Sequence, residues 1–474
     1  MEEYARLAVE ESLRLGAEYA EARVQRDLDH TYTLKNGTAE PVNLARRLGV
    51  GIRVIVDGAL GFASTNSLQL DEVRSTAGSA VRTARASRRL IASPTRLSQE
   101  KSWEDHWEAK MKIDVRGVST EEKFEALFTI EKSLAQENVH VSLPSRILLF
   151  NEDLTEKYYV NCEGANLHGF VPRLSLFFIL TASEPGKGTV QRMRHEAQSC
   201  GWEAVEDWKL SEIAADEART LGRLLREGVS PPRGEVDAVL GPEITGIICH
   251  ESCGHPQEAD RILGREAAQA GESYIKRDML GERIGTENVT IIDDPTLSNS
   301  YGFYLYDDEG VKAGPRTLIK EGVIAGFLQN RETAAELGVA SNGASRSAAY
   351  DREPIIRMAN TYMEPGDHTF EELIEGVKRG VYMKSFMEWN IDDRRYNQRY
   401  VGLEAYLIED GEITTPVRNP ILEVTTPGLY GSVDAVGKEM EFAGATCGKG
   451  DPMQGAPVWT GGPPIRLRQI RLGG

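Results

Sequence analysis

The chain has 474 residues, of which 40% are hydrophobic, and it carries a formal net charge of −18. At about 150 residues per domain, this length indicates two or three domains, and the apolar content is sufficient for a buried core. The acidic surface would repel phosphate backbones, so we expect no nucleic-acid partner.

The beginning of the chain and its cysteines argue against a secreted or membrane protein. Residues 2–16 predict an amphipathic helix, with no basic segment and no continuous apolar run of the kind found in signal peptides. No later window approaches the ~18 apolar residues of a membrane helix. Five cysteines are too few, and odd in number, for a disulfide framework. We therefore expect a cytoplasmic protein with no membrane partner.

A hairpin and a helix follow in the first hundred residues. Residues 51–65 predict a β-hairpin, because Asp57 and Gly58 form a turn pair between two apolar runs. Residues 69–92 return to helical periodicity. This mixture of short strands and helices is typical of an α/β arrangement.

The segment before residue 230 alternates strands and a helix in the same way. Residues 146–183 predict antiparallel strands joined by turns. A helix is expected to follow, with Ser211 as its N-cap and Gly228 near its C-cap. Residues 231–234, with the sequence PPRG, then predict a connection between domains, because proline and glycine favour turns.

The pattern after this connection is dominated by strands. Residues 235–240 predict a strand, and Pro242 suits the first position of a short helix. Later strand pairs surround the turns Glu321-Gly322 and Asp410-Gly411. We predict an α+β protein in which an α/β N-terminal domain, 1–230, precedes a β-sheet-dominated C-terminal domain, 235–474.

The sequence HESCGH at residues 250–255 carries the clearest chemical pattern. Imidazole nitrogens are common zinc ligands, and an adjacent carboxylate that is not a ligand can accept a proton from water. His250 and His255 could therefore bind zinc, with Glu251 as general base. The better-known zinc motif H-E-x-x-H separates its histidines by four residues, whereas here the separation is five.

A spacing of five requires a distorted helix. On a regular helix the two side chains would differ by roughly 140° in direction and would not share a face. Gly254 permits unusual backbone angles, and Pro256 disfavours helical angles at His255, so the helix could loosen or end between the histidines. The alternative is a π-type turn, which brings residues i and i+5 into register.

Two histidines leave a catalytic zinc one ligand short. Residue type alone leaves several remote candidates open, namely His168, His195, Cys200, His368 and Cys447. Cys249 and Cys253 lie beside the two histidines, but a free cysteine is usually a small buried hydrophobic residue.

Four segments together resemble the TldD/PmbA family of metallopeptidases. They are HESCGH, RETAAELG, RMANTYMEPG and CGKGDPMQGAPV, and they occur in the family's order over nearly the whole chain. The chain is similar to the TldD-type member, since the PmbA-type member lacks the histidine motif. The resemblance implies zinc held by His250, His255 and Cys447, with Glu251 as the general base.

The same resemblance implies a substrate groove and a partner. The RMANTY segment would line a peptide groove through Arg357, Asn360 and Thr361, because peptides often bind by adding to a strand edge. The family also implies a homodimer, or a heterodimer with a PmbA-type paralogue. The predicted function is a Zn²⁺-dependent peptidase for short or unfolded peptides. The alternative is a non-catalytic, zinc-containing binding or regulatory protein.

Overall fold

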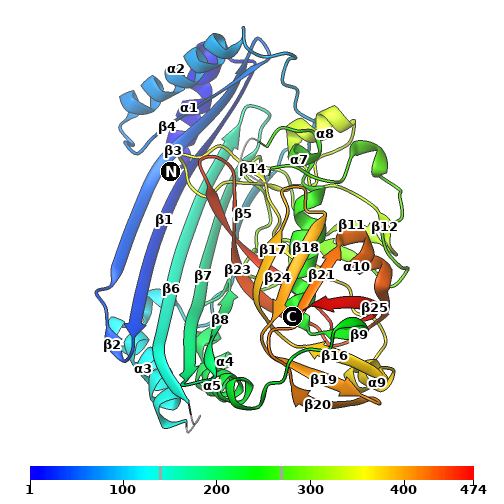
Figure 1. Cartoon of the computed structure of the whole chain (residues 1–474). Coiled ribbons are helices and arrows are strands. Elements are labelled where there is room, and N and C mark those ends of the chain that lie inside the picture. Colours follow the sequence, from blue (N-terminus) through cyan, green and yellow to red (C-terminus); the bar gives the residue numbers. More distant parts are fainter. Residues whose placement is uncertain (138–140, 267–270, 474) are drawn as a thin grey trace.

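A computed structural model describes residues 1–137, 141–266 and 271–473. Its N-terminal half is built on one long, curved sheet in the order β4-β3-β1-β6-β7-β5, with β2 on β1 and β8 on β7 (Figure 1). The strands are β1 (Tyr19–Lys35), β2 (Thr38–Ala39), β3 (Asn43–Val56), β4 (Ala59–Thr65), β5 (Glu104–Glu108), β6 (Ser142–Asn161), β7 (Asn166–Glu184) and β8 (Gly188–Gln198). The predicted hairpin at 51–65 and the antiparallel strands at 146–183 are confirmed.

Helices pack on this sheet at its two ends. The pair α1 and α2 lies at one end and the group α3, α4 and α5 at the other, each over its own apolar cluster (Figure 1). The helices are α1 (Glu2–Arg14), α2 (Leu70–Ser87), α3 (Thr120–Gln136), α4 (Glu203–Asp207) and α5 (Leu210–Glu227). The prediction of Ser211 as an N-cap is wrong, because the N-cap is Lys209, in a left-handed conformation, and α5 begins at Leu210. Gly228 does end the helix, as predicted.

The C-terminal half contains two larger sheets. One has the order β12-β11-β10-β15-β24-β23, and the other has the order β17-β18-β21-β25-β9-β16-β19-β20 with β22 on β25. The first contains β10 (Ile291–Asp293), β11 (Arg316–Lys320), β12 (Val323–Ile324), β15 (Asn360–Met363), β23 (Glu441–Lys449) and β24 (Gln454–Gly462). The second contains β9 (Gly234–Leu240), β16 (Arg379–Met383), β17 (Phe386–Ile391), β18 (Asn397–Gly402), β19 (Ala405–Glu409), β20 (Glu412–Pro416), β21 (Ile421–Thr425), β22 (Val433–Val436) and β25 (Ile465–Gly473).

Short elements complete this half. They are α6 (Pro242–Cys249), α7 (Ala259–Ile262), α8 (Arg331–Leu337), α9 (Phe370–Glu375) and α10 (Thr426–Ser432), with the small pair β13 (Ser345–Arg346) and β14 (Ile355–Ile356). The predicted α+β class is confirmed. No helix in the described ranges is both long enough and apolar enough to cross a bilayer.

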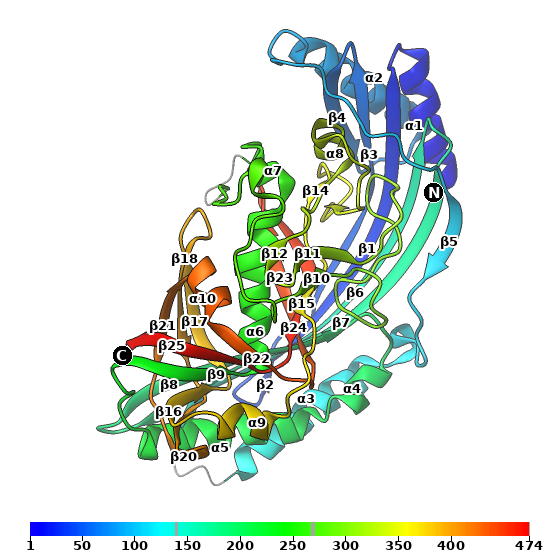
Figure 2. The ribbon, with the colours of Figure 1, turned by 90° about the vertical axis from the view of Figure 1, so that its right-hand side faces the viewer.

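One face of the long sheet lies along the C-terminal half (Figure 2), and ion pairs with buried carboxylates join the two. Arg53 on β3 lies 2.6 Å from Glu309, and Lys157 on β6 lies 2.9 Å from Asp308. The side chain of Glu309 is fully buried. Because buried charges are costly without their partners, these pairs tie the two halves together.

Candidate metal centre

Helix α6 carries the first part of the site through the core of the C-terminal half (Figure 2). Pro242 occupies its first turn, as predicted, where the missing N–H leaves no bond unmade. Every residue from Ile244 to Cys249 is buried, and the helix packs against β15, β23 and β24. The helix thus delivers its C-terminal end to a position between the sheets.

The histidine motif continues α6 as a π turn, His250–Gly254. This was the alternative distortion, and it has the expected consequence. The rings of His250 and His255 meet edge to face, with centroids 4.9 Å apart and planes at 81°. Five-residue spacing therefore places both imidazoles on one side of the helix.

The expected roles of Gly254 and Pro256 are corrected by the structure. Both Gly254 and His255 keep right-handed helical angles, so neither residue breaks the helix. Gly254 is required for space instead, because a Cβ there would lie 1.9 Å from the sulfur of Met358. The π turn thus passes closer to Met358 than any other residue type would permit.

Cys447 completes a three-residue group. It lies on β23, and its Sγ is 3.3 Å from Nε2 of His255. One ligand atom each from His250, His255 and Cys447 lies within 4.8 Å of the other two, and all three residues are buried. Within residues 1–137, 141–266 and 271–473, no other cluster of histidine, cysteine or carboxylate side chains has this geometry.

The chemistry of these side chains suits a zinc ion. Burial lowers the pKa of His250, which keeps the imidazole neutral, and its buried Nδ1 has no hydrogen-bond partner among the described residues. Burial alone would raise the pKa of Cys447, but His255 and Arg357 outweigh it and bring the value to about 7. Zinc binds to neutral imidazoles and to deprotonated thiols, so both side chains favour the forms that zinc requires.

Glu258 orients His255 from behind. Its Oε2 lies 3.0 Å from Nδ1 of the imidazole, leaving Nε2 to face Cys447. Arg261 and Lys449 lie 2.6 and 3.3 Å from the same oxygen. Burial would raise the pKa of Glu258, but Lys449, His255 and Arg261 hold it well below its ordinary value. Such carboxylate–histidine contacts fix the ring and raise its basicity as a ligand.

Glu251 points toward the β17–β18 turn. Its Oε2 accepts a 2.8 Å bond from Nη1 of Arg395, and its Oε1 accepts a 3.3 Å bond from the indole of Trp389. Burial opposes ionisation, but His255, His250 and Arg395 lower the pKa of Glu251. The carboxylate thus favours its ionised form beside the three-residue group.

The three residues expected to contact a peptide lie in the interior. Arg357 donates to the backbone oxygens of Gln454 and Cys447. Asn360 and Thr361 belong to β15, which is paired on both sides, with β10 and with β24. The strand therefore has no free edge at these residues, contrary to the predicted strand-edge groove. Arg357 instead braces the hairpin that carries Cys447.

The other candidate ligands lie apart from the site. His195, on β8, packs against Phe177 and Tyr301, and burial lowers its pKa to about 4. Cys249 and Cys253 belong to the apolar core, as expected of free buried thiols. The chain's remaining candidates, His168, Cys200 and His368, also fall outside the three-residue group.

Sequence reasoning missed Glu258, Arg261, Trp389 and Arg395. For two of them, Glu258 and Arg261, the spacing along the sequence could have pointed to the site. An acidic residue three positions after a ligand histidine lies within reach of its free ring nitrogen, and Arg261 follows Glu258 at the same spacing. Arg395 and Trp389 come from a distant hairpin, and no local pattern points to them.

Three domain models of a single protein family match successive parts of the chain. The PmbA/TldA metallopeptidase domain 1 matches residues 20–84, the central domain of that family matches residues 113–223, and its C-terminal domain matches residues 233–474. A metalloprotease of Methanocaldococcus jannaschii is 30% identical over 97% of each chain. A zinc metalloprotease TldD homolog of Saccharolobus solfataricus is 27% identical, over 98% of this chain and 99% of that one.

Solved structures share the fold. A Thermotoga maritima protein described as a candidate modulator of DNA gyrase superimposes with a TM-score of 0.79 at 18% identity, over 100% of both chains. TldE from Thermococcus kodakarensis gives a TM-score of 0.74 at 18% identity, over 98% of this chain and 100% of that one. At this identity the likeness concerns the fold alone.

Proposed function

We propose, from the premise that the chain belongs to the PmbA/TldD family of metallopeptidases, that it hydrolyses short or unfolded peptides with the help of zinc. The observation that carries this proposal is the meeting of His250, His255 and Cys447 next to Glu251. Three protein ligands leave one coordination position for water or substrate, which is the arrangement of catalytic zinc sites. A structural site would be expected to use a fourth protein ligand.

Glu251 is the proposed general base. Zinc, when bound by His250, His255 and Cys447, would polarise the scissile carbonyl and make water a better nucleophile. Glu251 would accept the proton of the attacking water and deliver it to the leaving amine. Arg395 and Trp389 hold the two carboxylate oxygens, so the base starts each cycle ionised and aligned. Glu258 keeps His255 in the tautomer that ligates through Nε2.

Asn360, Thr361 and Arg357 have supporting roles in this proposal. Thr361 donates a 2.9 Å bond to Asp293, and Asn360 donates to Ser300 at 2.8 Å. These bonds fix β15, against which α6 and β24 pack. The three residues thus hold the site in shape, and the peptide is expected to bind elsewhere.

The proposal includes a reducing, cytoplasmic location and a partner subunit. All five cysteines are free thiols, and the thiolate of Cys447 is needed as a ligand. A homodimer is our first expectation, and a heterodimer with a PmbA-type paralogue is the second. Light scattering on the purified chain, alone and with such a paralogue, distinguishes them. An active monomer would contradict the assembly.

The decisive experiment compares Glu251→Gln with wild type. We expect the variant to keep zinc and to lose cleavage of an unstructured peptide by about 100-fold or more, since general-base catalysis contributes that much. Metal content is measured by elemental analysis and cleavage by mass spectrometry. Glu412→Gln, an exposed carboxylate on β20, is the matched control and should cleave normally. Unchanged cleavage in Glu251→Gln would overturn the proposal, and zinc without cleavage in wild type would favour a binding or regulatory protein.

A further inference from the structure

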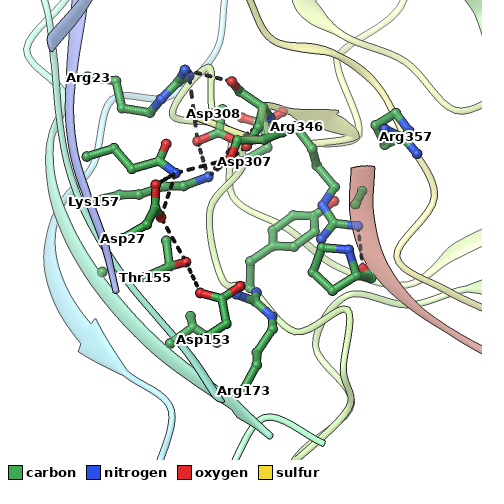
Figure 3. A pocket seen from close by; sticks show the side chains of 18 of the residues that line it. Arg23, Asp27, Asp153, Thr155, Lys157, Arg173, Asp307, Asp308, Arg346 and Arg357 are labelled. Atoms are coloured by element: carbon green, nitrogen blue, oxygen red, sulfur yellow. Dashed lines mark hydrogen bonds and ion pairs between the residues drawn. The ribbon is translucent and has the colours of Figure 1, made fainter. Parts of the chain in front are cut away.

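A cavity separate from the metal centre lies on the interface between the two halves of the chain. Its volume is about 350 Å³, which is within the range of small-molecule sites. Strands β1, β6 and β7 form one wall, and the loops around residues 301–308 and 346–348 form another (Figure 3). Residues 446 and 455–457 of the β23–β24 hairpin also line it, while His250, Glu251 and His255 do not.

The cavity carries more positive than negative side chains. Six cations line it, namely Arg23, Arg47, Lys157, Arg173, Arg346 and Arg357, against four carboxylates, namely Asp27, Asp153, Asp307 and Asp308. Two of these carboxylates already form ion pairs with cations of the cavity. Asp308 pairs with both Lys157 and Arg23, and Asp27 lies 3.6 Å from Arg47.

Three buried arginines form no ion pair within the described part of the chain. Arg173 donates to the backbone oxygens of Tyr301 and Phe303, at 2.9 and 3.2 Å. Arg346 donates in the same way to Met358 and Pro457, at 2.7 and 2.9 Å. Arg357 does so as well, and the arginines use only part of their five donors on carbonyls. A buried guanidinium without a directly bonded carboxylate is costly and calls for an explanation.

Two buried donors also lack an acceptor. Nε of Arg357 and Nε of Arg23 have no hydrogen-bond partner in the described residues. Arg357 and Arg23 are only 1% and 4% exposed. Burial, together with the neighbouring Arg173 and Arg357, lowers the pKa of Arg346 to about 10, although Tyr304 opposes the shift. The cavity is thus short of negative charge.

We propose that this cavity is a binding site for a small organic carboxylate. A carboxylate matches the planar fork of a guanidinium and would neutralise the unpaired arginines. A doubly charged phosphate fits less well, because Asp27 and Asp153 face the same space (Figure 3). Aromatic side chains complete the wall, namely Trp107, Tyr301, Tyr304 and Tyr306, and they favour a ligand with an apolar or aromatic body.

The cavity is separate from the metal centre, but both contact the hairpin that carries Cys447. Arg357 joins the cavity to the backbone oxygen of Cys447, so occupancy would reach the hairpin that holds this ligand. The carboxylate could be the C-terminus of a short peptide or a free acid from another source. Both share the recognition chemistry, and the test separates them. The inference does not depend on peptide hydrolysis, because binding is measured on the full chain carrying Glu251→Gln, in which the proposed function predicts no cleavage of the probes.

Calorimetry on the full chain tests the site with three probes. They are acetyl-Phe-Ala with a free C-terminus, the same compound as its C-terminal amide, and phenylacetate. We expect the free acid to bind at least about ten-fold more tightly than the amide, because only the acid pairs with the arginines. Binding of phenylacetate as tight as that of the acid would identify a free organic acid as the source, and weaker binding would identify a peptide terminus.

Variants locate the binding. Arg173→Gln should weaken binding of the free acid about ten-fold. Arg418→Gln should not weaken it, although Arg418 also donates to backbone oxygens, those of Leu224 and Lys187, outside the cavity. Trp107→Phe keeps every charge and should reduce the change in tryptophan emission on binding, even if Arg173→Gln fails to fold. Equal affinities for acid and amide, or a change in emission that is undiminished in Trp107→Phe, would overturn the proposal.

Discussion

Glu258 is the residue through which the charges of the site are connected. One of its oxygens faces His255, Arg261 and Lys449 at 3.0, 2.6 and 3.3 Å, and the residue is fully buried. Lys449 also lies 2.7 Å from Asp260 and donates to the backbone of Ile356. Lys449, two positions after Cys447 on the hairpin, thus meets Glu258, an extended residue three positions after His255. The two segments that carry the proposed metal ligands therefore share this carboxylate.

Replacing Glu258 by glutamine should loosen the metal centre. His255 would lose the acceptor that fixes its tautomer, and outer contacts of this kind are worth about 10–100-fold in metal affinity. We expect zinc affinity to fall by that factor in competition with a chromophoric chelator. Glu412→Gln should retain wild-type affinity. Equal affinities in both variants would exclude an orienting role for Glu258.

Arg395 is expected to act as a positioning residue for Glu251. In Arg395→Met the carboxylate loses its 2.8 Å partner, so we expect kcat to fall about ten-fold or more while zinc content and KM stay close to wild type. Arg395→Lys should recover part of the loss, because it restores a cation. Loss of bound zinc in Arg395→Met would indicate a structural role instead.

Two elements, the π turn and helix α6, decide where the two histidines proposed as metal ligands lie. The π turn brings the two imidazole rings into contact on one side of the helix. At its other end, α6 is fixed by Glu243, which lies 2.6 Å from Arg192 on β8. Arg192 also lies 3.0 Å from Glu217 on α5. A strand of the N-terminal half thus anchors the helix that carries the site.

The close passage of the π turn past Met358 can be tested by adding a methyl group. Gly254→Ala places a Cβ 1.9 Å from the sulfur of Met358, and overpacking of this kind costs about 1–3 kcal/mol. We expect a lower unfolding midpoint in urea and weaker zinc binding. Gly254→Ala combined with Met358→Ala should recover part of both relative to the sum of the single changes. Purely additive effects would mean that the contact is not the cause.

The Arg192 connection predicts a pH-dependent stability. Burial would raise the pKa of Glu217, but Arg192 and Arg194 lower it below its ordinary value of 4.5. The ionised carboxylate therefore stabilises the fold fully above that value, and the contribution is lost as pH falls through the lowered pKa.

Glu217→Gln should accordingly destabilise the protein by about 2 kcal/mol at pH 7, as expected for a hydrogen-bonded buried ion pair. The difference from wild type should shrink below pH 4.5. Urea unfolding followed by circular dichroism at pH 7 and pH 3.5 measures it. A difference that stays constant with pH would contradict the assignment.

At the scale of the whole molecule, the two halves share a charged interface. Arg331 of α8 donates to the backbone oxygen of Ser98, and Glu309 accepts from both Arg53 and the backbone N–H of Arg331. The fully buried Glu309 would face solvent or remain unpaired without the long sheet. The C-terminal half thus depends on its neighbour for the partners of its own buried charges.

A fragment of residues 235–474 is therefore expected not to fold alone. We predict that it shows no cooperative thermal transition and is rapidly digested by trypsin, while the full chain melts cooperatively and resists digestion. The reason is the loss of Arg53 and Lys157 as partners of Glu309 and Asp308. A fragment that melts cooperatively would show that the two halves are independent.

Local features of the site were predictable, and remote ones were not. The five-residue spacing of His250 and His255 limited the backbone to a few distortions, one of which is observed. The hairpin at Asp57 and the helix beginning at Pro242 followed from turn and capping chemistry. Arg395, by contrast, reaches Glu251 across 144 positions, and such pairings depend on sheet topology, which periodicity does not contain.

The two-sided pairing of β15 explains the incorrect expectation for Asn360 and Thr361. A short strand with the sequence NTYM has the same pattern at an edge or in the middle of a sheet. Only the arrival of β24, a hundred residues later, decides that the strand is central. The same long-range pairing decides which side chains of the hairpin face the metal centre and which face the cavity.

The distance along the chain between His255 and Cys447 has a consequence for biosynthesis. The two residues are 192 positions apart, so a ribosome making about 5–20 residues per second adds Cys447 about 10–40 s after His255. During that interval the nascent chain offers two imidazoles without their thiolate and without the docked hairpin. In the proposed zinc site, firm binding would have to wait until β23 has been translated, so metal loading would follow the synthesis of the segment between the histidines and this strand.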